Sequence, residues 1–185
     1  STYQAVSGAG IAGLAELKQN VQASISDEVF EPKVFQYPIA FNLIPHIDEF
    51  VEAGYTREEM KMVHETRKIL HRPDLPIVAT TVRVPVYRSH SESINLELEK
   101  EADIEKVRAL MAEAPGIILQ DDPSVNLYPM PLFTSDTDPV YVGRIRKDIS
   151  VVNGVVLWAV ADQIRKGAAT NAVQIAEEVI KKNLY

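Results

Sequence analysis

Cysteine is absent from the 185 residues, which excludes disulfide bonds, cysteine-ligated metal sites and a thiolate nucleophile within the chain. No apolar run approaches the roughly 20 residues that a membrane helix needs, and no charged segment followed by an apolar one opens the chain. Lysine and arginine are not clustered, and the formal charge of −7 disfavours a nucleic-acid-binding surface. No His and carboxylate pair has metal-ligand spacing. We therefore expect a cytoplasmic protein with no metal, nucleic-acid or membrane partner.

Hydrophobic periodicity predicts strands and helices in an irregular order. Strands are expected at Thr2–Val6, 38–45, Ile77–Val86, Ser93–Glu99, 116–120, 140–147 and 155–161. Helices are expected at Ile11–Ser26, at Thr56–Leu70 with a capping box, after Asp103 as N-cap, and at Ala168–Asn183. Because strands outnumber helices and often follow one another, the pattern predicts an α+β fold with a mostly antiparallel mixed sheet and helices on one face.

A polar interruption divides two alternating runs in the segment TTVRVPVYRSHSESINLELEK, residues 80–100. An uninterrupted strand would send Arg83 and His90 to opposite faces, because their sequence parity differs. A turn or bulge at Arg88-Ser89 would instead bring both into one cleft. An arginine grips carboxylates with two hydrogen bonds, and histidine transfers protons near neutral pH. A surface arginine and a hydrogen-bonded loop histidine remain the alternative.

Two further motifs carry functional and structural interpretations. GAGIAG, residues 8–13, matches the dinucleotide-binding glycine pattern, but the prolines that follow do not suit a second buried parallel strand, so we favour a tight strand-to-helix turn. Glu58, Glu59 and Lys61 lie in the first turns of a predicted helix, where a cation and the helix N-terminus favour an anion such as phosphate. A solvated, salt-bridged helix face is the simpler interpretation of these charges.

Five blocks, in the expected order, resemble the C-terminal half of the aspartate-semialdehyde dehydrogenase family in its Gram-positive-like branch. They are STYQAVSGAG, EEMKMVHETRKIL, VRVPVYRSHSESI, VGRIRKD and KGAATNAVQIAEE, and they span Ser1 to Glu178. The resemblance implies a glyceraldehyde-3-phosphate dehydrogenase-like C-terminal domain and an NADP-dependent oxidoreductase. The implied enzyme interconverts aspartate 4-semialdehyde, phosphate and NADP with 4-phospho-aspartate and NADPH, in the biosynthesis of diaminopimelate, lysine, threonine and methionine.

The resemblance also implies roles for individual residues at the substrate. His90 resembles the acid–base histidine of the family, and Gln4 the glutamine that orients the acyl group near the nucleophile. Arg83 resembles the residue that binds the substrate α-carboxylate. Glu58 resembles the partner of the substrate ammonium, with Glu59 as an alternative. Lys61 resembles the lysine of the phosphate site.

Three more residues are implied contacts of the cofactor NADP: Ser7 and Gly8 through the backbone at its nicotinamide end, and Asn171 at the carboxamide. In the family, a catalytic cysteine and an NADP-binding domain precede the part that this sequence resembles. The sequence contains no cysteine and begins within a predicted strand. We therefore expect a fragment that is inactive alone.

The resemblance also implies an arrangement of domains and subunits. Residues 1–185 are expected to form one substrate-binding and dimerisation domain, with a closing helix from about 168 to 185 that packs on the NADP-binding domain. A homodimer or tetramer is expected. Two alternatives remain: an N-acetyl-glutamyl-phosphate reductase relative, whose PMxRG block is not found, and a non-catalytic self-association module.

Overall fold

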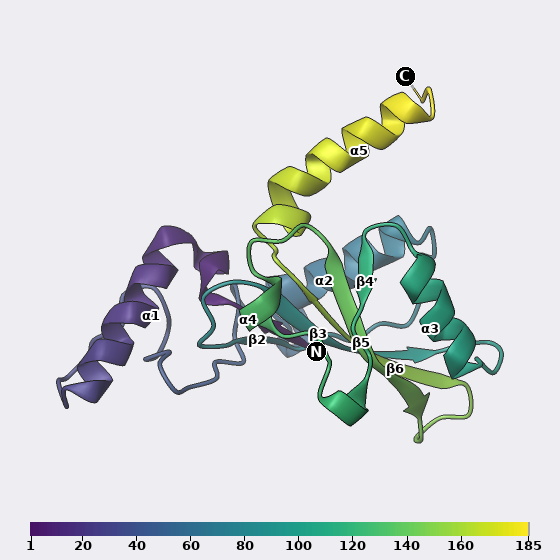
Figure 1. Ribbon diagram of the computed structural model, residues 1–185. Coiled ribbons are helices and arrows are strands. Elements are labelled where there is room, and N and C mark those ends of the chain that lie inside the picture. Colours follow the sequence, from purple (N-terminus) through teal and green to yellow (C-terminus); the bar gives the residue numbers. More distant parts are fainter. Residues whose placement is uncertain (185) are drawn as a thin grey trace. The chain divides into compact units, whose positions relative to one another are not determined.

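The computed structural model describes residues 1–184, which fall into two compact units, one from Ser1 to Tyr87 and one that begins at Arg88 (Figure 1). Both units combine helices with strands, as the α+β prediction requires. Among the described residues, no helix is both long and apolar enough to cross a bilayer.

The first unit contains two short strands and two long helices. In chain order these are β1 (Thr2–Gln4), α1 (Gly10–Ile25), α2 (Arg57–Ile69) and β2 (Thr81–Arg83), with 3₁₀ turns at Val6–Ala9 and Glu52–Gly54. Strands β1 and β2 run parallel, and their register places Gln4 beside Arg83. The predicted strand Ile77–Val86 is reduced to the three residues of β2. Beyond Arg83, single hydrogen bonds to the first segment continue at Val84 and Val86, but the Val86 amide also turns back to the Val84 carbonyl at 2.8 Å, which ends the extended conformation.

Helix α1 fixes the long loop that follows it through buried polar side chains. The Glu16 carboxylate, 4% exposed, accepts hydrogen bonds from the amides of Lys33, Val34 and Phe35 at 2.6–3.1 Å. The Asn20 side chain accepts a fourth from the amide of Ala40 at 2.7 Å. Four backbone donors of the loop are thereby satisfied without a strand partner.

The predicted strand at residues 38–45 is wrong. Phe41 has a left-handed backbone (φ 58°), which interrupts the extended conformation, and only Ile44 pairs, in an isolated bridge with Arg83. Of the apolar residues that caused the prediction, Ile39 and Ile44 are buried in the core that includes Leu17 of α1, whereas Phe41 and Leu43 are exposed. The core of this unit comprises Val6, Leu17, Phe35, Ile39 and Ile44.

The second unit is built on a four-stranded mixed sheet in the order β3-β6-β5-β4. The strands are β3 (His90–Glu97), β4 (Ile117–Leu119), β5 (Val140–Asp148) and β6 (Gly154–Ala161). The ladders β3–β6 and β5–β6 are antiparallel, and β4–β5 is parallel, which confirms the mostly antiparallel character. The helices are α3 (Ile104–Glu113), α4 (Pro131–Thr134) and α5 (Thr170–Lys181).

One face of this sheet is covered by α3, as expected. Asp103 caps α3 through the amides of Glu105 and Lys106, which was predicted from the sequence. The apolar side of α3 packs on Val142, Ile145, Val155 and Leu157. Because side chains alternate along a strand, Trp158 lies on the opposite face, where its indole nitrogen donates to the Pro129 carbonyl at 3.0 Å.

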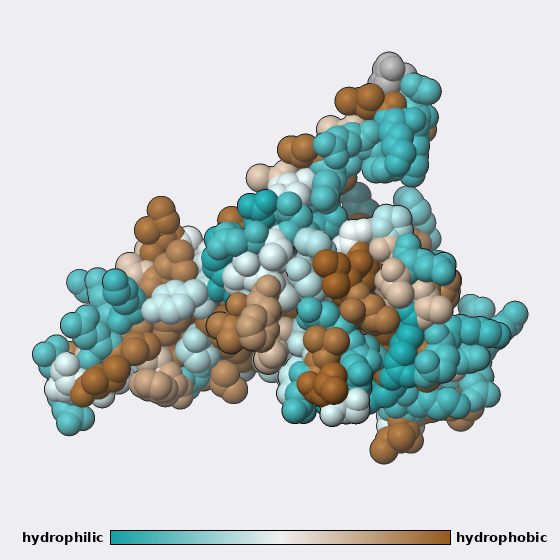
Figure 2. Space-filling model, in the orientation of Figure 1, coloured by the Kyte–Doolittle hydropathy of each residue, from teal (hydrophilic) through white to brown (hydrophobic). Residues whose placement is uncertain are grey.

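Helix α5 is the closing helix of the sequence prediction, and it has no buried residue. A π-helical turn at Arg165–Ala169 precedes it, and Figure 1 shows α5 leaving the sheet of its unit. Val173, Ile175 and Ile180 are each more than half exposed, and Figure 2 shows hydrophobic atoms along α5 beside hydrophilic ones. Tyr185, at the end of the predicted helix, lies outside the described residues.

Candidate functional site

The first unit brings six of the eight candidate site residues close together. Gln4 Nε2 donates to Glu58 Oε1 at 3.2 Å, and Lys61 Nζ donates to Glu58 Oε2 at 3.2 Å. Gln4 is itself oriented by Thr2, whose hydroxyl donates to Gln4 Oε1 at 3.1 Å. The strand β1 and the first turns of α2 thus present an amide, a carboxylate and an ammonium group in one hydrogen-bonded row.

Arg83 completes this group from β2. The residue is 8% exposed, its Nη1 donates to the Ala5 carbonyl at 2.7 Å, and its guanidinium lies 5.9 Å from the Phe35 ring centroid. Burial lowers the pKa of Arg83 from its usual value, and the charge of Glu58 acts in the opposite direction. Arginine nevertheless stays protonated at physiological pH, so the cluster contains a buried cation with hydrogen-bond donors suited to a carboxylate.

The two neighbouring glutamates of α2 have different partners. Glu59 is 8% exposed, and its carboxylate accepts from the amide of Thr56 at 2.9 Å in the predicted capping box and from the amide of Thr81 at 3.0 Å. Both of its oxygens are therefore engaged by the backbone. Glu58 touches only other side chains of the candidate site in the contacts above, and one-fifth of its side chain is exposed. The geometry favours Glu58 over Glu59 as the ligand-binding residue.

Ser7 and Gly8 lie in the 3₁₀ turn between β1 and α1. Their amides are used within the unit: Ser7 donates to the Tyr87 carbonyl at 3.2 Å and Gly8 to the Ala5 carbonyl at 3.1 Å. Gly8 is exposed, and a Cβ at this position would lie 2.7 Å from Arg83 Nη1. The absence of a side chain on Gly8 therefore lets the Arg83 guanidinium lie against the turn.

The glycine motif itself acts as a structural turn, the interpretation that we favoured. Gly10 begins α1 with a left-handed φ of 71°. A Cβ on Gly13 would lie 2.5 Å from the Val6 carbonyl oxygen, so Gly13 allows α1 to pack closely on the preceding turn. The parallel partner of β1 is β2, 77 residues or more along the chain, and not the next element as in a dinucleotide-binding unit.

His90 and Asn171 belong to the second unit. The polar interruption is confirmed: β2 ends at Arg83, Ser89 has a left-handed φ of 69°, and β3 begins at His90. The predicted start at Ser93 is wrong, because His90 already pairs with Ala161 of β6. That Arg83 and His90 share one cleft stays a prediction. Asn171 lies half-buried in the first turn of α5.

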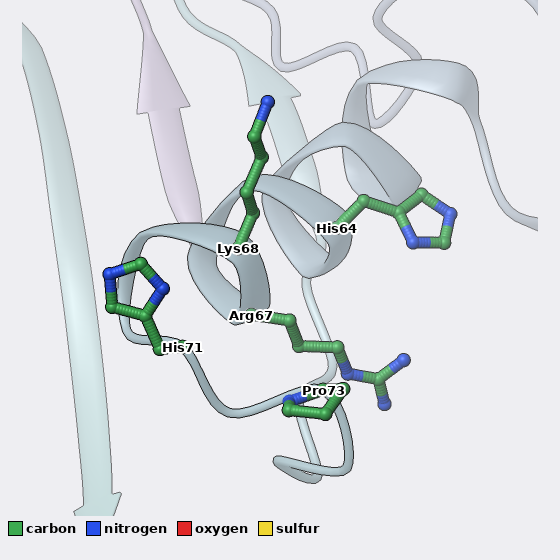
Figure 3. Close-up of a pocket in the computed structure, with 5 residues that line it drawn as sticks. All are labelled: His64, Arg67, Lys68, His71 and Pro73. Atoms are coloured by element: carbon green, nitrogen blue, oxygen red, sulfur yellow. The ribbon is translucent and has the colours of Figure 1, made fainter.

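A shallow hollow at the other end of α2 is a poor alternative site. Its lining comprises His64, Arg67, Lys68, His71 and Pro73. Figure 3 shows that these side chains point in different directions, and Arg67 Nε is held by the Leu75 carbonyl at 2.8 Å. The C-terminal end of a helix also carries a partial negative charge, so these cations are arranged to stabilise α2 rather than to bind an anion.

Sequence reasoning missed two groups of residues that support these side chains. Phe35 lies beneath the Arg83 guanidinium and is fixed by Glu16, whereas Asp162 accepts hydrogen bonds in the second unit beside the start of β3. Neither stands in a recognisable motif, because each contact joins residues far apart in the chain. The structure identifies both groups by a buried carboxylate, Glu16 in the first unit and Asp162 in the second, because a buried charge requires nearby partners.

The sequence matches the family model described as semialdehyde dehydrogenase, dimerisation domain, over residues 1–166. Relatives named aspartate-semialdehyde dehydrogenase include those of Bacillus subtilis, 51% identical over 100% of this chain and 56% of the relative, and of Aquifex aeolicus, 52% identical over 100% and 54%. The chain thus spans about half the length of the curated relatives that it matches.

Solved structures give the same result. The aspartate semialdehyde dehydrogenase II of Vibrio cholerae superposes with a TM-score of 0.93 at 45% identity, over 97% of this chain and 53% of that one. A second structure of the Vibrio cholerae enzyme, described as complexed with ASA, matches with the same TM-score and identity.

Proposed function

The chain belongs to the semialdehyde dehydrogenase family, in its dimerisation domain, and from this premise we propose that it supplies the substrate-binding half of an NADP-dependent aspartate-semialdehyde dehydrogenase. The reaction is the interconversion of aspartate 4-semialdehyde, phosphate and NADP with 4-phospho-aspartate and NADPH. It serves the biosynthesis of diaminopimelate, lysine, threonine and methionine. The names of the curated relatives support an aspartyl substrate over an N-acetyl-glutamyl one.

One observation carries the proposal: the cation Arg83 and the anion Glu58 lie beside Gln4, and a second cation, Lys61, is paired with Glu58. Arg83 offers guanidinium donors for the substrate α-carboxylate, and Glu58 offers a carboxylate for its ammonium group. Lys61, 54% exposed and paired with Glu58, offers a positive charge for phosphate. A molecule with an α-amino acid head and a phosphorylated end matches this distribution of charge.

The proposed chemistry divides between this chain and groups that it does not contain. Since there is no cysteine, a thiolate that attacks the aldehyde must come from outside these residues. His90 exchanges the proton of the nucleophile and of the reacting oxygen, and Gln4 orients the acyl oxygen with its amide. NADP, when bound, accepts or supplies the hydride. Gly8 and Ser7 would lie at its nicotinamide end, with Asn171 at the carboxamide.

A binding titration tests the proposal on the chain itself. We expect calorimetry to detect weak, salt-sensitive binding of L-aspartate and of inorganic phosphate. Arg83→Ala should remove the binding of aspartate, and Lys61→Ala that of phosphate. Lys68→Ala is the matched control, because Lys68 lies on the same helix but away from Glu58, and it should leave both unchanged. Aspartate binding by Arg83→Ala at the parental affinity would refute the assignment of Arg83.

A further inference from the structure

A fully buried carboxylate, Asp162, lies directly after β6 in the second unit. Its side chain is 0% exposed, its Oδ2 lies 2.6 Å from Arg88 Nη2, and the same oxygen accepts from the Asp136 amide at 2.7 Å. Its Oδ1 accepts from the Ile164 amide at 3.0 Å. Both oxygens are therefore satisfied, which is the condition under which a buried charge is tolerated.

Arg88 joins this buried carboxylate to a second segment. Besides Asp162, its guanidinium pairs through Nη1 with the carboxylate of Asp136, which is 73% exposed. A break in a buried ion pair leaves an uncompensated charge, so the Arg88–Asp162 link is costly to open. It holds the chain before β3 to the chain after β6.

Ser89, the next residue, is held in an unfavourable conformation. Its φ is 69° and it is 0% exposed. A non-glycine residue in this region is strained and persists only where its surroundings determine its conformation. The preceding residue, Arg88, is fixed by its ion pair with Asp162. The Ser89 hydroxyl itself lies 3.1 Å from Ser135 Oγ, and Ser135 Oγ donates to the Pro131 carbonyl at 2.8 Å.

His90 follows immediately and begins β3. Its register partner is Ala161, the residue before Asp162. The ion pair and the serine pair therefore fix both strands at the end of the ladder from which the His90 side chain emerges. The orientation of this side chain is set by a backbone that is constrained on both sides.

We propose that Asp162 is a positioning residue for His90, acting through Arg88 and the left-handed Ser89. This inference rests on the proposed function, which gives His90 its acid–base role. Loss of the Asp162 charge releases the turn, and His90 no longer stands where the proton must be exchanged. A misplacement of about 1 Å lowers turnover by up to roughly 100-fold.

The test uses this chain joined to the part of the Bacillus subtilis relative that it does not cover, with Asp162→Asn, Ser135→Ala and the control Asp138→Asn. Asp138 pairs with Arg165 at 2.6 Å and accepts a hydrogen bond from Thr170. The substitution Asp138→Asn therefore removes a nearby ion pair that does not include Arg88. NMR of labelled histidine reports the His90 ring, and the His90 signal is identified by its loss in His90→Asn. Steady-state kinetics supply kcat and KM.

We expect Asp162→Asn to move the His90 signal and to lower kcat by about 10- to 100-fold, with KM for the semialdehyde within about twofold. Ser135→Ala removes the contact to the Ser89 hydroxyl and should move the same signal by less. If Asp162→Asn does not fold, this variant still measures whether the turn positions His90. Asp138→Asn should change neither. An unmoved His90 signal and unchanged kcat in folded Asp162→Asn and Ser135→Ala would overturn the inference. A parent without turnover would refute the proposed function instead, and the NMR comparison would still decide the role of Asp162.

Discussion

Glu58 and Glu59 stand side by side in the sequence but differ in what surrounds them. Glu59 is bound to the amides of Thr56 and Thr81, so its carboxylate joins the start of α2 to β2. Glu58 is bound to Gln4 and Lys61. The first set of contacts stabilises the fold, whereas the second links residues that we assign to the substrate and phosphate.

These two residues therefore give opposite predictions. Glu59→Ala leaves two amides without acceptors and should lower the free energy of unfolding by about 2 kcal/mol or more. Glu58→Gln keeps its shape and should change stability little, while the loss of the carboxylate charge removes aspartate binding. Chemical denaturation and calorimetry measure the two effects. A large stability loss in Glu58→Gln with intact aspartate binding would reverse the assignment.

Sequence reasoning at this scale succeeded where a motif is local and failed where a contact is remote. The capping box, three residues apart, was predicted and is present. The row Gln4, Glu58 and Lys61 required a resemblance to a family, because the Gln4–Glu58 contact spans 54 positions. Arg88–Asp162 spans still more of the chain and was not found, since neither residue differs in type from ordinary surface charges.

At the scale of elements, long periodic segments were predicted well and short strands poorly. Helices α1, α2 and α3 and strands β5 and β6 lie close to their expected positions. The strand predicted at residues 38–45 does not form, because Phe41 has a left-handed backbone and only Ile39 and Ile44 of its large apolar residues are buried in the core with α1. β3 begins three residues earlier than expected, since pairing with β6 extends to His90 despite its polar neighbours.

The turn between β5 and β6 gives a pH-dependent prediction. Hydrogen bonds from Ser150 and Asn95 lower the pKa of Asp148 below its usual value. An acid with a depressed folded-state pKa contributes stability above its unfolded pKa of about 3.9, and this stability is lost as the pH falls through the folded value. Asp148→Asn should therefore lower the Tm at pH 7.

The decisive comparison for Asp148 is the difference in Tm between parent and Asp148→Asn as a function of pH. It should shrink as the pH falls from about 4 through the lowered folded-state pKa, because the unfolded chain takes up the proton first and the folded carboxyl follows. Asp74→Asn provides a control at an exposed carboxylate. A Tm difference that stays constant from pH 7 to pH 2 would show that the charge of Asp148 is not responsible.

At the scale of the whole molecule, the family description of a dimerisation domain predicts self-association. The sheet face opposite α3 carries Ser93 and Trp158, and we expect two copies to pair there in an isologous contact. Ser93→Arg should weaken the dimer in analytical ultracentrifugation, whereas Glu113→Arg on the exposed side of α3 should not. A monomeric parent at micromolar concentration would contradict the prediction.

The central claim is that this chain binds and orients the substrate but does not supply the nucleophile. Its most direct test is phosphate-dependent NADPH formation from aspartate 4-semialdehyde, measured for the chain alone and for the chain joined to the part of the Bacillus subtilis relative that it does not cover. We predict no turnover above background for the chain alone. The joined protein should form NADPH only with phosphate, and Arg83→Ala should lower its kcat/KM by about 100-fold or more. NADPH formation by the chain alone, or an unchanged kcat/KM in the joined Arg83→Ala protein, would contradict the account.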